Sequence, residues 1–230
     1  MQQLPLGVRL RVSARFSTFQ VGANGMVAAE LAEVAAGAGP RVLWLHGPPG
    51  SGRTHLLQAA CAAGGERGAI AAYLPLASVG DAGTLAGLES LDLVCLDDLE
   101  AALGRADWER ALFVLHHELL ERGGRLVLAA SGPPVLAPVV LPDLASRLAA
   151  ASVLALRPLP ETALGEALVA RAAAQGLELP EDTLGYLLRR APRDFAALCR
   201  LLDEIDTAAL AAQRRLTVPL VREVLERQDG

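Results

Sequence analysis

Short apolar runs alternate with helix-length segments over the first two thirds of the chain. Strand-like runs are expected at residues 42–45, 69–74, 93–96, 126–130 and 153–156. Runs of this length, separated by segments long enough for a helix, are typical of a parallel sheet covered by helices. The pattern therefore predicts an α/β fold for this part of the chain.

The clearest helix between two of these runs is expected at residues 107–122. Its apolar residues fall on one helical face and comprise Trp108, Ala111, Leu112, Leu115 and Leu119. Asp107 is predicted to cap the N-terminus, because its side-chain oxygen can accept a hydrogen bond from a free backbone N–H group. Gly123 and Gly124 are predicted to end the helix.

The pattern changes after Pro158, where strand-like runs stop. Helices are expected at residues 161–175, 181–190, 194–212 and 218–227. Prolines stand where these helices begin or are separated, and Thr217 can cap the last of them. We therefore predict a short tail at residues 1–12, an α/β domain at residues 13–158 and a small all-helical domain at residues 159–230.

Composition narrows the classes of protein to consider. The 230 residues are 52% hydrophobic, and the formal net charge is −5. A negative charge argues against a main role in gripping DNA, since phosphate neutralisation needs a basic face. Residues 126–142 carry no charge, but one glycine and three prolines near their centre would interrupt a membrane-spanning helix. With no secretory signal visible, we expect a cytoplasmic protein without a membrane span.

The cysteines and histidines do not indicate a metal site. Cys61, Cys95 and Cys199 lie far apart inside apolar patterns and are expected to be reduced core residues. The four histidines, at positions 46, 55, 116 and 117, show no ligand spacing, and the adjacent pair would point to different faces of its helix.

A glycine-rich loop follows the first predicted strand. Its eight residues are Gly47, Pro48, Pro49, Gly50, Ser51, Gly52, Arg53 and Thr54. They match a phosphate-binding loop in which backbone N–H groups cradle phosphates, with arginine in place of the usual lysine. Thr54 can place its hydroxyl on Mg²⁺, whereas Arg53 keeps the charge in a planar fork rather than a compact point. Nucleotide binding is therefore better supported than turnover.

Acidic residues end the predicted strand at 93–96. Asp97 can hold Mg²⁺ or its water, and Asp98 is near enough to position a nucleophilic water. Ser131 follows the strand at 126–130 and would bring a hydroxyl to the same sheet edge, although a serine before two prolines is typical of a turn. Arg147 ends a short helical segment, where it can either pair within its own chain or reach a neighbouring subunit's nucleotide.

Together these residues resemble the AAA+ ATPases, and more narrowly the Hda family, relatives of the bacterial replication initiator DnaA. The resemblance covers nearly the whole chain. It rests on the segments GPPGSGRTHLLQAAC, LDLVCLDDLE, LPDLASRL and AAQRRLTVPLVREVLE. It implies an AAA+ module, in which a parallel-sheet nucleotide-binding domain is followed by a helical lid.

The resemblance also assigns roles to single residues. Asp97 matches the Walker B aspartate, Ser131 falls at the sensor 1 position, and Arg147 matches the arginine finger. Arg193, in the segment APRDFAAL, matches the sensor 2 arginine of the lid. Phe19, Val21 and Asn24 fall where such proteins cover the adenine. The cofactors implied are ADP or ATP, with Mg²⁺ held through the nucleotide by Thr54 and Asp97.

The chain departs from the family pattern in two places. Ser131 and Gly132 stand where the family often has aspartate and arginine, which weakens the case for hydrolysis at this site. The N-terminal residues Gln2, Gln3, Leu4, Pro5 and Leu6 have the residue types of a clamp-binding peptide. Their glutamine stands closer to the Leu-Pro-Leu anchor than in the family's longer form, and a disordered terminus explains so short a motif equally well.

The function implied by the resemblance is negative regulation of replication initiation. An ADP-bound adaptor would bind the DNA polymerase III β sliding clamp, meet DNA only through the clamp, and supply Arg147 to ATP-bound DnaA. Such a protein needs no independent enzymatic activity, although Asp98 beside Asp97 leaves room for a weak ATPase. A homo-oligomer is also compatible with the family.

Two other functions compete with this interpretation. The first is an autonomous AAA+ ATPase that loads or remodels a partner, as helicase-loader relatives do. The second is a small-molecule kinase that uses the same phosphate loop, which is disfavoured because no acceptor-site signature is visible.

Overall fold

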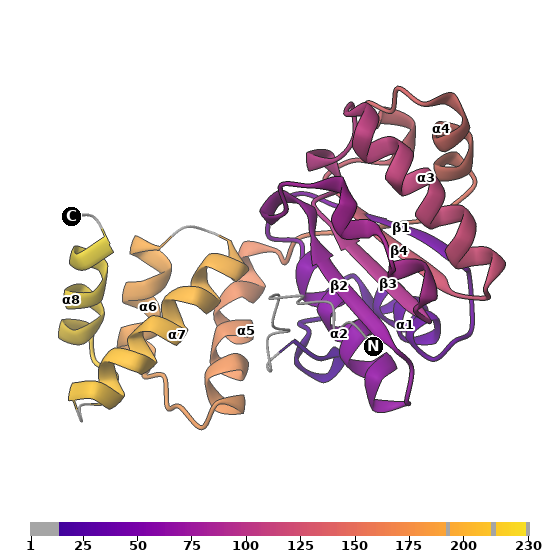
Figure 1. The fold of residues 1–230 in the computed structure, drawn as a ribbon. Coiled ribbons are helices and arrows are strands. Elements are labelled where there is room, and N and C mark those ends of the chain that lie inside the picture. The colour runs from indigo at the N-terminus through magenta and orange to yellow at the C-terminus, as the bar shows by residue number, and fades with distance from the viewer. Residues whose placement is uncertain (1–13, 192–193, 213–214, 229–230) are drawn as a thin grey trace. The chain divides into compact units, whose positions relative to one another are not determined.

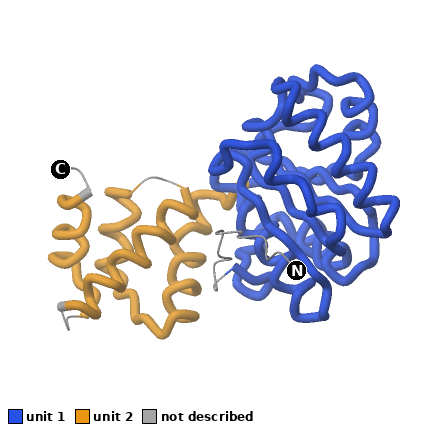
Figure 2. The backbone as a smooth tube through the Cα atoms, viewed as in Figure 1, with its two compact units in different colours: residues 1–157 blue, residues 158–230 orange. Residues whose placement is uncertain are grey.

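A computed structural model describes residues 14–191, 194–212 and 215–228 of the chain. The chain divides into two compact units, residues 1–157 and residues 158–230 (Figure 2). The predicted tail with Gln2, Gln3, Leu4, Pro5 and Leu6 lies outside the described residues, as does Arg193.

The first unit is built on one parallel sheet of five strands (Figure 1). The strands are β1 (Val42–His46), β2 (Ala71–Pro75), β3 (Leu93–Asp97), β4 (Arg125–Ala130) and β5 (Ser152–Ala155). Their order across the sheet is β2-β3-β4-β1-β5, and all four neighbouring pairs are parallel. This arrangement confirms the predicted fold class and places β4 between β1 and β3.

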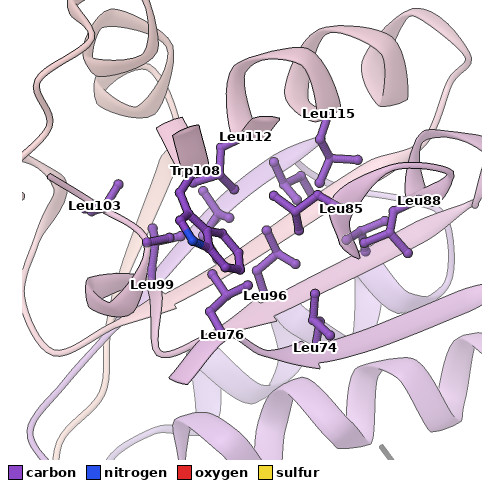
Figure 3. Packing of buried hydrophobic residues seen from close by; sticks show 14 of the residues in the cluster. Leu74, Leu76, Leu85, Leu88, Leu96, Leu99, Leu103, Trp108, Leu112 and Leu115 are labelled. Carbon is purple, nitrogen blue, oxygen red and sulfur yellow. The ribbon is translucent and has the colours of Figure 1, made fainter. Parts of the chain in front are cut away.

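Helices cover both faces of the sheet. On one face lie α1 (Gly25–Ala35) and α2 (Arg53–Glu66), and on the other lie α3 (Ala106–Glu121) and α4 (Pro142–Ala149). Side chains alternate between the faces along each strand. Thus Leu43 and Leu45 pack with the first pair of helices, whereas Trp44 packs with the second. In Figure 3, Trp108 and Leu112 of α3 lie over Leu96 and other leucines of the sheet.

Helix α3 follows the predicted apolar stripe, but its start differs from the prediction. The helix begins at Ala106, and its N-cap is Arg105, which makes no side-chain capping hydrogen bond. Asp107 therefore lies inside the first turn and cannot be the cap. Its carboxylate instead pairs with Arg105 at 3.7 Å, where a negative charge also suits the positive end of the helix dipole.

Glu109 is the fully buried carboxylate of this helix. It accepts hydrogen bonds from the backbone N–H groups of Gly104 at 2.8 Å, Val140 at 3.0 Å and Leu141 at 2.6 Å. Burial acts to raise the pKa of Glu109, but these three donors outweigh it and lower the pKa below its ordinary value. Glu109 thus ties α3 to the segment that leads into α4.

The second unit is all-helical among its described residues. It contains α5 (Glu161–Ala174), α6 (Glu181–Arg190), α7 (Phe195–Ala212) and α8 (Val218–Gln228). Its own hydrophobic core is formed by side chains such as Leu168, Leu202, Ile205 and Val221, each of which is fully buried. The unit therefore has the core of an independent domain.

No helix in the described ranges is long and apolar enough to cross a membrane. The three cysteines form no disulfide, and Cys61 and Cys95 are buried, whereas Cys199 is half-buried.

Candidate nucleotide-binding site

The sheet brings the ends of three strands together at one edge. His46, which ends β1, pairs with Ala130 of β4, so the glycine-rich loop and Ser131 start from neighbouring positions. Asp97 ends β3, which is paired with the other side of β4. The carboxyl edge of a parallel sheet is where ligands bind in α/β folds, and here it carries most of the predicted site residues.

The glycine-rich loop has the backbone of an anion cradle. Gly52 precedes α2 and has a φ of 96°, while Gly50 has a φ of 77°. A side chain at Gly52 would be strained and would also lie 2.6 Å from the ring of Phe19. Gly47 is equally confined, because a Cβ there would stand 2.8 Å from the carbonyl oxygen of Leu156. The loop therefore directs free N–H groups of the α2 N-terminus to the sheet edge.

Thr54 and Asp97, the two predicted Mg²⁺ ligands, are in direct contact. The Thr54 hydroxyl donates to Asp97 Oδ2 at 2.6 Å, and the Tyr73 hydroxyl donates to the same oxygen at 2.9 Å. Burial and the negative charge of Asp97 raise the pKa of Tyr73, so Tyr73 stays a protonated donor. The Asp97 carboxylate is almost fully buried and is held from two sides.

Asp98 follows in an uncommon backbone conformation. Its φ of 53° is the only positive φ of a non-glycine residue in the described ranges. Burial, and then the charges of Asp97 and Glu100, raise its pKa, while Arg53 acts in the opposite direction. Asp98 is thus a stronger base than an ordinary aspartate, and it stands on a strained turn of the kind often found at functional sites.

Arg53 forms an ion pair with Glu100, a carboxylate that was not among the predicted site residues. Its Nη1 lies 3.9 Å from Oε1 of Glu100, and only 14% of the Arg53 side chain is exposed. Glu100 stands in the short 3₁₀ helix η5 (Leu99–Ala101) directly after β3. The backbone N–H of Ser131 donates to the same Glu100 oxygen. Glu100 therefore links the loop cation Arg53 to Ser131.

The residues predicted to cover the adenine differ in availability. The Phe19 ring lies against Gly52 and is tilted over His55, with ring centroids 5.6 Å apart. The Asn24 side chain instead makes hydrogen bonds to the backbone of Arg157. Its amide donates to the Arg157 carbonyl at 2.8 Å and its oxygen accepts from the Arg157 N–H at 2.9 Å. Phe19 thus lies next to the glycine-rich loop, whereas the side chain of Asn24 binds the backbone of Arg157.

Arg147 lies on α4 and packs against α3. Its guanidinium carbon is 4.4 Å from the ring centroid of Phe113, and its Nη1 is 3.3 Å from His116 Nδ1. Arginine can only donate, so Nδ1 must be the acceptor of a neutral imidazole. Burial, and then the Arg147 charge, lower the pKa of His116, which keeps it neutral. No carboxylate pairs with Arg147 among the described residues, so the expected intrachain ion pair is not what holds it.

Two buried polar atoms of the glycine-rich loop indicate that the site suits a phosphate. Ser51 Oγ and Arg53 Nη1 are buried without a hydrogen-bond partner among the described residues. Both belong to the glycine-rich loop, and orphaned buried donors are costly unless a ligand or water satisfies them. An anionic phosphate supplies the acceptors that these donors lack. The residues present therefore fit a Mg²⁺ nucleotide held at the loop, Thr54 and Asp97.

The structure gathers most of the predicted site but not all of it. The loop, Asp97, Asp98 and Ser131 share one edge of the sheet, whereas Arg147 belongs to the opposite helical layer, with α3 and α4. Sequence reasoning missed Glu100 and Tyr73. Glu100 was visible as the last acid of the run after β3, while no signal could have linked Tyr73 to Asp97 before the strand register was known.

Comparisons with known proteins agree with this architecture. Residues 161–225 match the family model described as "Hda, lid domain". Domain III of DnaA from Thermotoga maritima superimposes with a TM-score of 0.77 at 20% identity, over 96% of this chain and 98% of that one. AMPPCP-bound DnaA from Aquifex aeolicus gives a TM-score of 0.70 at 21% identity, over 96% of this chain and 70% of that one.

A more distant likeness is the RuvB branch migration motor of Thermotoga maritima. Its TM-score is 0.61 at 19% identity, over 90% of this chain and 69% of that one. The helical unit therefore matches the Hda lid model over residues 161–225, and the chain as a whole has the fold of DnaA domain III.

Proposed function

We propose that this protein is a negative regulator of replication initiation that binds ADP, attaches to the DNA polymerase III β sliding clamp and stimulates ATP hydrolysis by DnaA. The observation that carries the proposal is the match of residues 161–225 to the Hda lid, beside a core that superimposes on DnaA domain III. Relatives of the initiator that keep its AAA+ architecture are suited to contact it as one AAA+ subunit contacts the next.

In this proposal the nucleotide bound by this protein stabilises the conformation of the chain and is not hydrolysed to drive a reaction. The glycine-rich loop would hold the phosphates, and Thr54 with Asp97 would hold Mg²⁺. When bound, the Mg²⁺ nucleotide would supply the charges that hold the loop, Thr54 and Asp97 in place at the carboxyl edge of the sheet. Ser131 would be the sensor 1 residue, and its backbone N–H already donates a hydrogen bond to Glu100. The site is therefore better equipped for binding than for turnover.

Arg147 would act on the ATP of DnaA. A guanidinium placed beside a γ-phosphate stabilises the charge that develops in the transition state. Arg147 is partly exposed at the surface of α4, and a π face and a neutral imidazole hold it without neutralising its charge. Weak holding of this kind would let the side chain extend toward a partner at low cost.

A reconstituted assay tests the whole proposal. Purified protein, DnaA, ATP, loaded clamp and ADP are combined, and hydrolysis of DnaA-bound ATP is followed while each component is left out in turn. We expect hydrolysis to fall to the rate of DnaA alone when this protein or the clamp is omitted. Hydrolysis that does not depend on adding this protein would contradict the proposed regulation.

The proposed clamp contact rests on the N-terminal tail and has its own test. Changing Leu4 and Leu6 to alanine is expected to abolish clamp binding, because spaced apolar anchors dominate the affinity of short extended peptides. Clamp capture is measured by surface plasmon resonance, and thermal unfolding serves as the folding control. The paired control changes Gln20 and Gln213, which lie outside the motif, to alanine. If the Leu4, Leu6 variant binds the clamp as the parent does, the tail is not the contact.

Asp98 favours one competing function, an autonomous AAA+ ATPase that loads or remodels a partner. Its raised pKa suits a base that orients water beside Asp97. The two functions differ in which residue matters. Robust turnover by the purified protein that is abolished by Asp97→Ala and unaffected by Arg147→Ala would favour the autonomous enzyme.

A further inference from the structure

Arg53 and Glu100 form the most unusual pair at the phosphate edge. The 3.9 Å separation between Arg53 Nη1 and Glu100 Oε1 is an ion pair but too long for a hydrogen bond. Arg53 Nη1 is buried and has no hydrogen-bond partner among the described residues. Glu100 therefore compensates the charge of Arg53 without using this donor.

Glu100 is held in place from the other side. Ser131 donates its backbone N–H to Glu100 Oε1, which is the same oxygen that faces Arg53. Burial acts to raise the pKa of Glu100, but hydrogen bonds from Ser131 and the nearby Arg53 lower it overall. The carboxylate is thus charged at neutral pH, and 44% of the Glu100 side chain is exposed.

The cation in a phosphate-binding loop serves the outer phosphates of a nucleotide. A diphosphate can use the backbone cradle and the free donor of Arg53 while the ion pair with Glu100 persists. A triphosphate adds a further anionic group on the outer side, which competes with Glu100 for Arg53 and meets a like charge. The Arg53–Glu100 ion pair therefore weakens the binding of a third phosphate more than that of a second.

We propose that Glu100 is a specificity-determining residue that makes this site select a nucleoside diphosphate over the corresponding triphosphate. The inference rests on the proposed nucleotide site. It deepens that site by naming the residue that rejects the third phosphate. Selectivity then arises because Glu100 repels the third phosphate of a triphosphate, rather than because extra contacts stabilise a diphosphate.

Binding of ADP and ATP to the purified protein tests the inference. Dissociation constants are measured by isothermal titration calorimetry in buffer with fixed Mg²⁺ and no DnaA or clamp. The unaltered protein is expected to bind ADP more tightly. Glu100→Gln keeps the shape and an acceptor for Ser131 but removes the charge, so the ATP-to-ADP ratio of dissociation constants should fall about fivefold, mainly through tighter ATP binding.

Two further variants separate charge from structure. Glu121→Gln removes an exposed carboxylate at the far end of α3 and is expected to leave the ratio unchanged. Glu100→Ala removes the carboxylate without introducing an amide and should lower the ratio as Glu100→Gln does. Circular dichroism and thermal unfolding confirm that each variant is folded.

Other results would overturn the inference. A ratio that stays at the parent value in both Glu100 variants, or a parallel weakening of ADP and ATP, means that Glu100 does not discriminate. Either result leaves the proposed action on DnaA standing, because these titrations contain no DnaA. Failure of the unaltered protein to bind either nucleotide would overturn the proposed nucleotide site and this inference together.

Discussion

Replacing Arg147 with alanine is expected to lower the stimulated rate of DnaA ATP hydrolysis by ~10³-fold or more, which would return it to the unstimulated rate. The reason is that no other group offered to the partner would supply the cationic charge at the γ-phosphate. Nucleotide binding and clamp binding by the variant should be unchanged, because Arg147 belongs to the α3 and α4 layer rather than to the phosphate edge. Phosphate release in the reconstituted assay measures the effect.

The control for this variant is Arg122→Ala. Arg122 is an exposed arginine at the C-cap of α3, so its removal matches the loss of charge without touching α4. It should stimulate DnaA as the parent does. Arg147→Lys should recover only part of the rate, because an ammonium cannot present the planar fork of a guanidinium. Undiminished stimulation by Arg147→Ala would rule out the arginine finger.

Glu109→Ala is expected to lower the free energy of unfolding of the first unit by about 3–5 kcal/mol. The substitution leaves three backbone N–H groups, those of Gly104, Val140 and Leu141, without their shared acceptor, which is itself fully buried. It also opens a void under the start of α4. Urea denaturation monitored by tryptophan fluorescence measures the change. Glu121→Ala, on the exposed end of the same helix, is the matched control and should stay within about 0.5 kcal/mol of the parent.

The pH dependence of this effect follows from the lowered pKa of Glu109. A carboxyl group whose folded-state pKa is below its unfolded value stabilises the fold above the unfolded value, which is 4.5 here. That stability is lost as the pH falls through the folded-state pKa. The difference in unfolding free energy between parent and Glu109→Ala should therefore be largest at neutral pH and shrink below pH 4.5. A difference that grew in acid would show that Glu109 is buried as the neutral acid.

The strands were predictable because apolar runs in a buried parallel sheet leave little choice of secondary structure. The least accurate was the run predicted at 69–74, which the structure places at Ala71–Pro75. Pro75 is tolerated as the last residue of β2 because β2 is an edge strand of the sheet, and its outer side needs no ladder partner.

Contacts between distant side chains were much harder to predict. Glu109 shares a helical face with Leu112 and His116, so a buried carboxylate could have been suspected there. Its three donors come from loops whose path the sequence does not reveal. For the same reason the loop residues were found by motif, whereas the pairing of Glu100 with Arg53 needed the turn after β3 to be known.

The environment of Trp44 provides a built-in optical probe. The chain has two tryptophans, and both are fully buried. The Trp44 indole N–H donates to the Gly132 carbonyl at 2.9 Å, one residue beyond Ser131, whereas Trp108 Nε1 has no hydrogen-bond partner among the described residues. A nucleotide that shifts the segment after β4 would alter the emission of Trp44 and leave Trp108 as a constant background. A Trp108→Phe protein would thus report ligand arrival by fluorescence, with no attached dye.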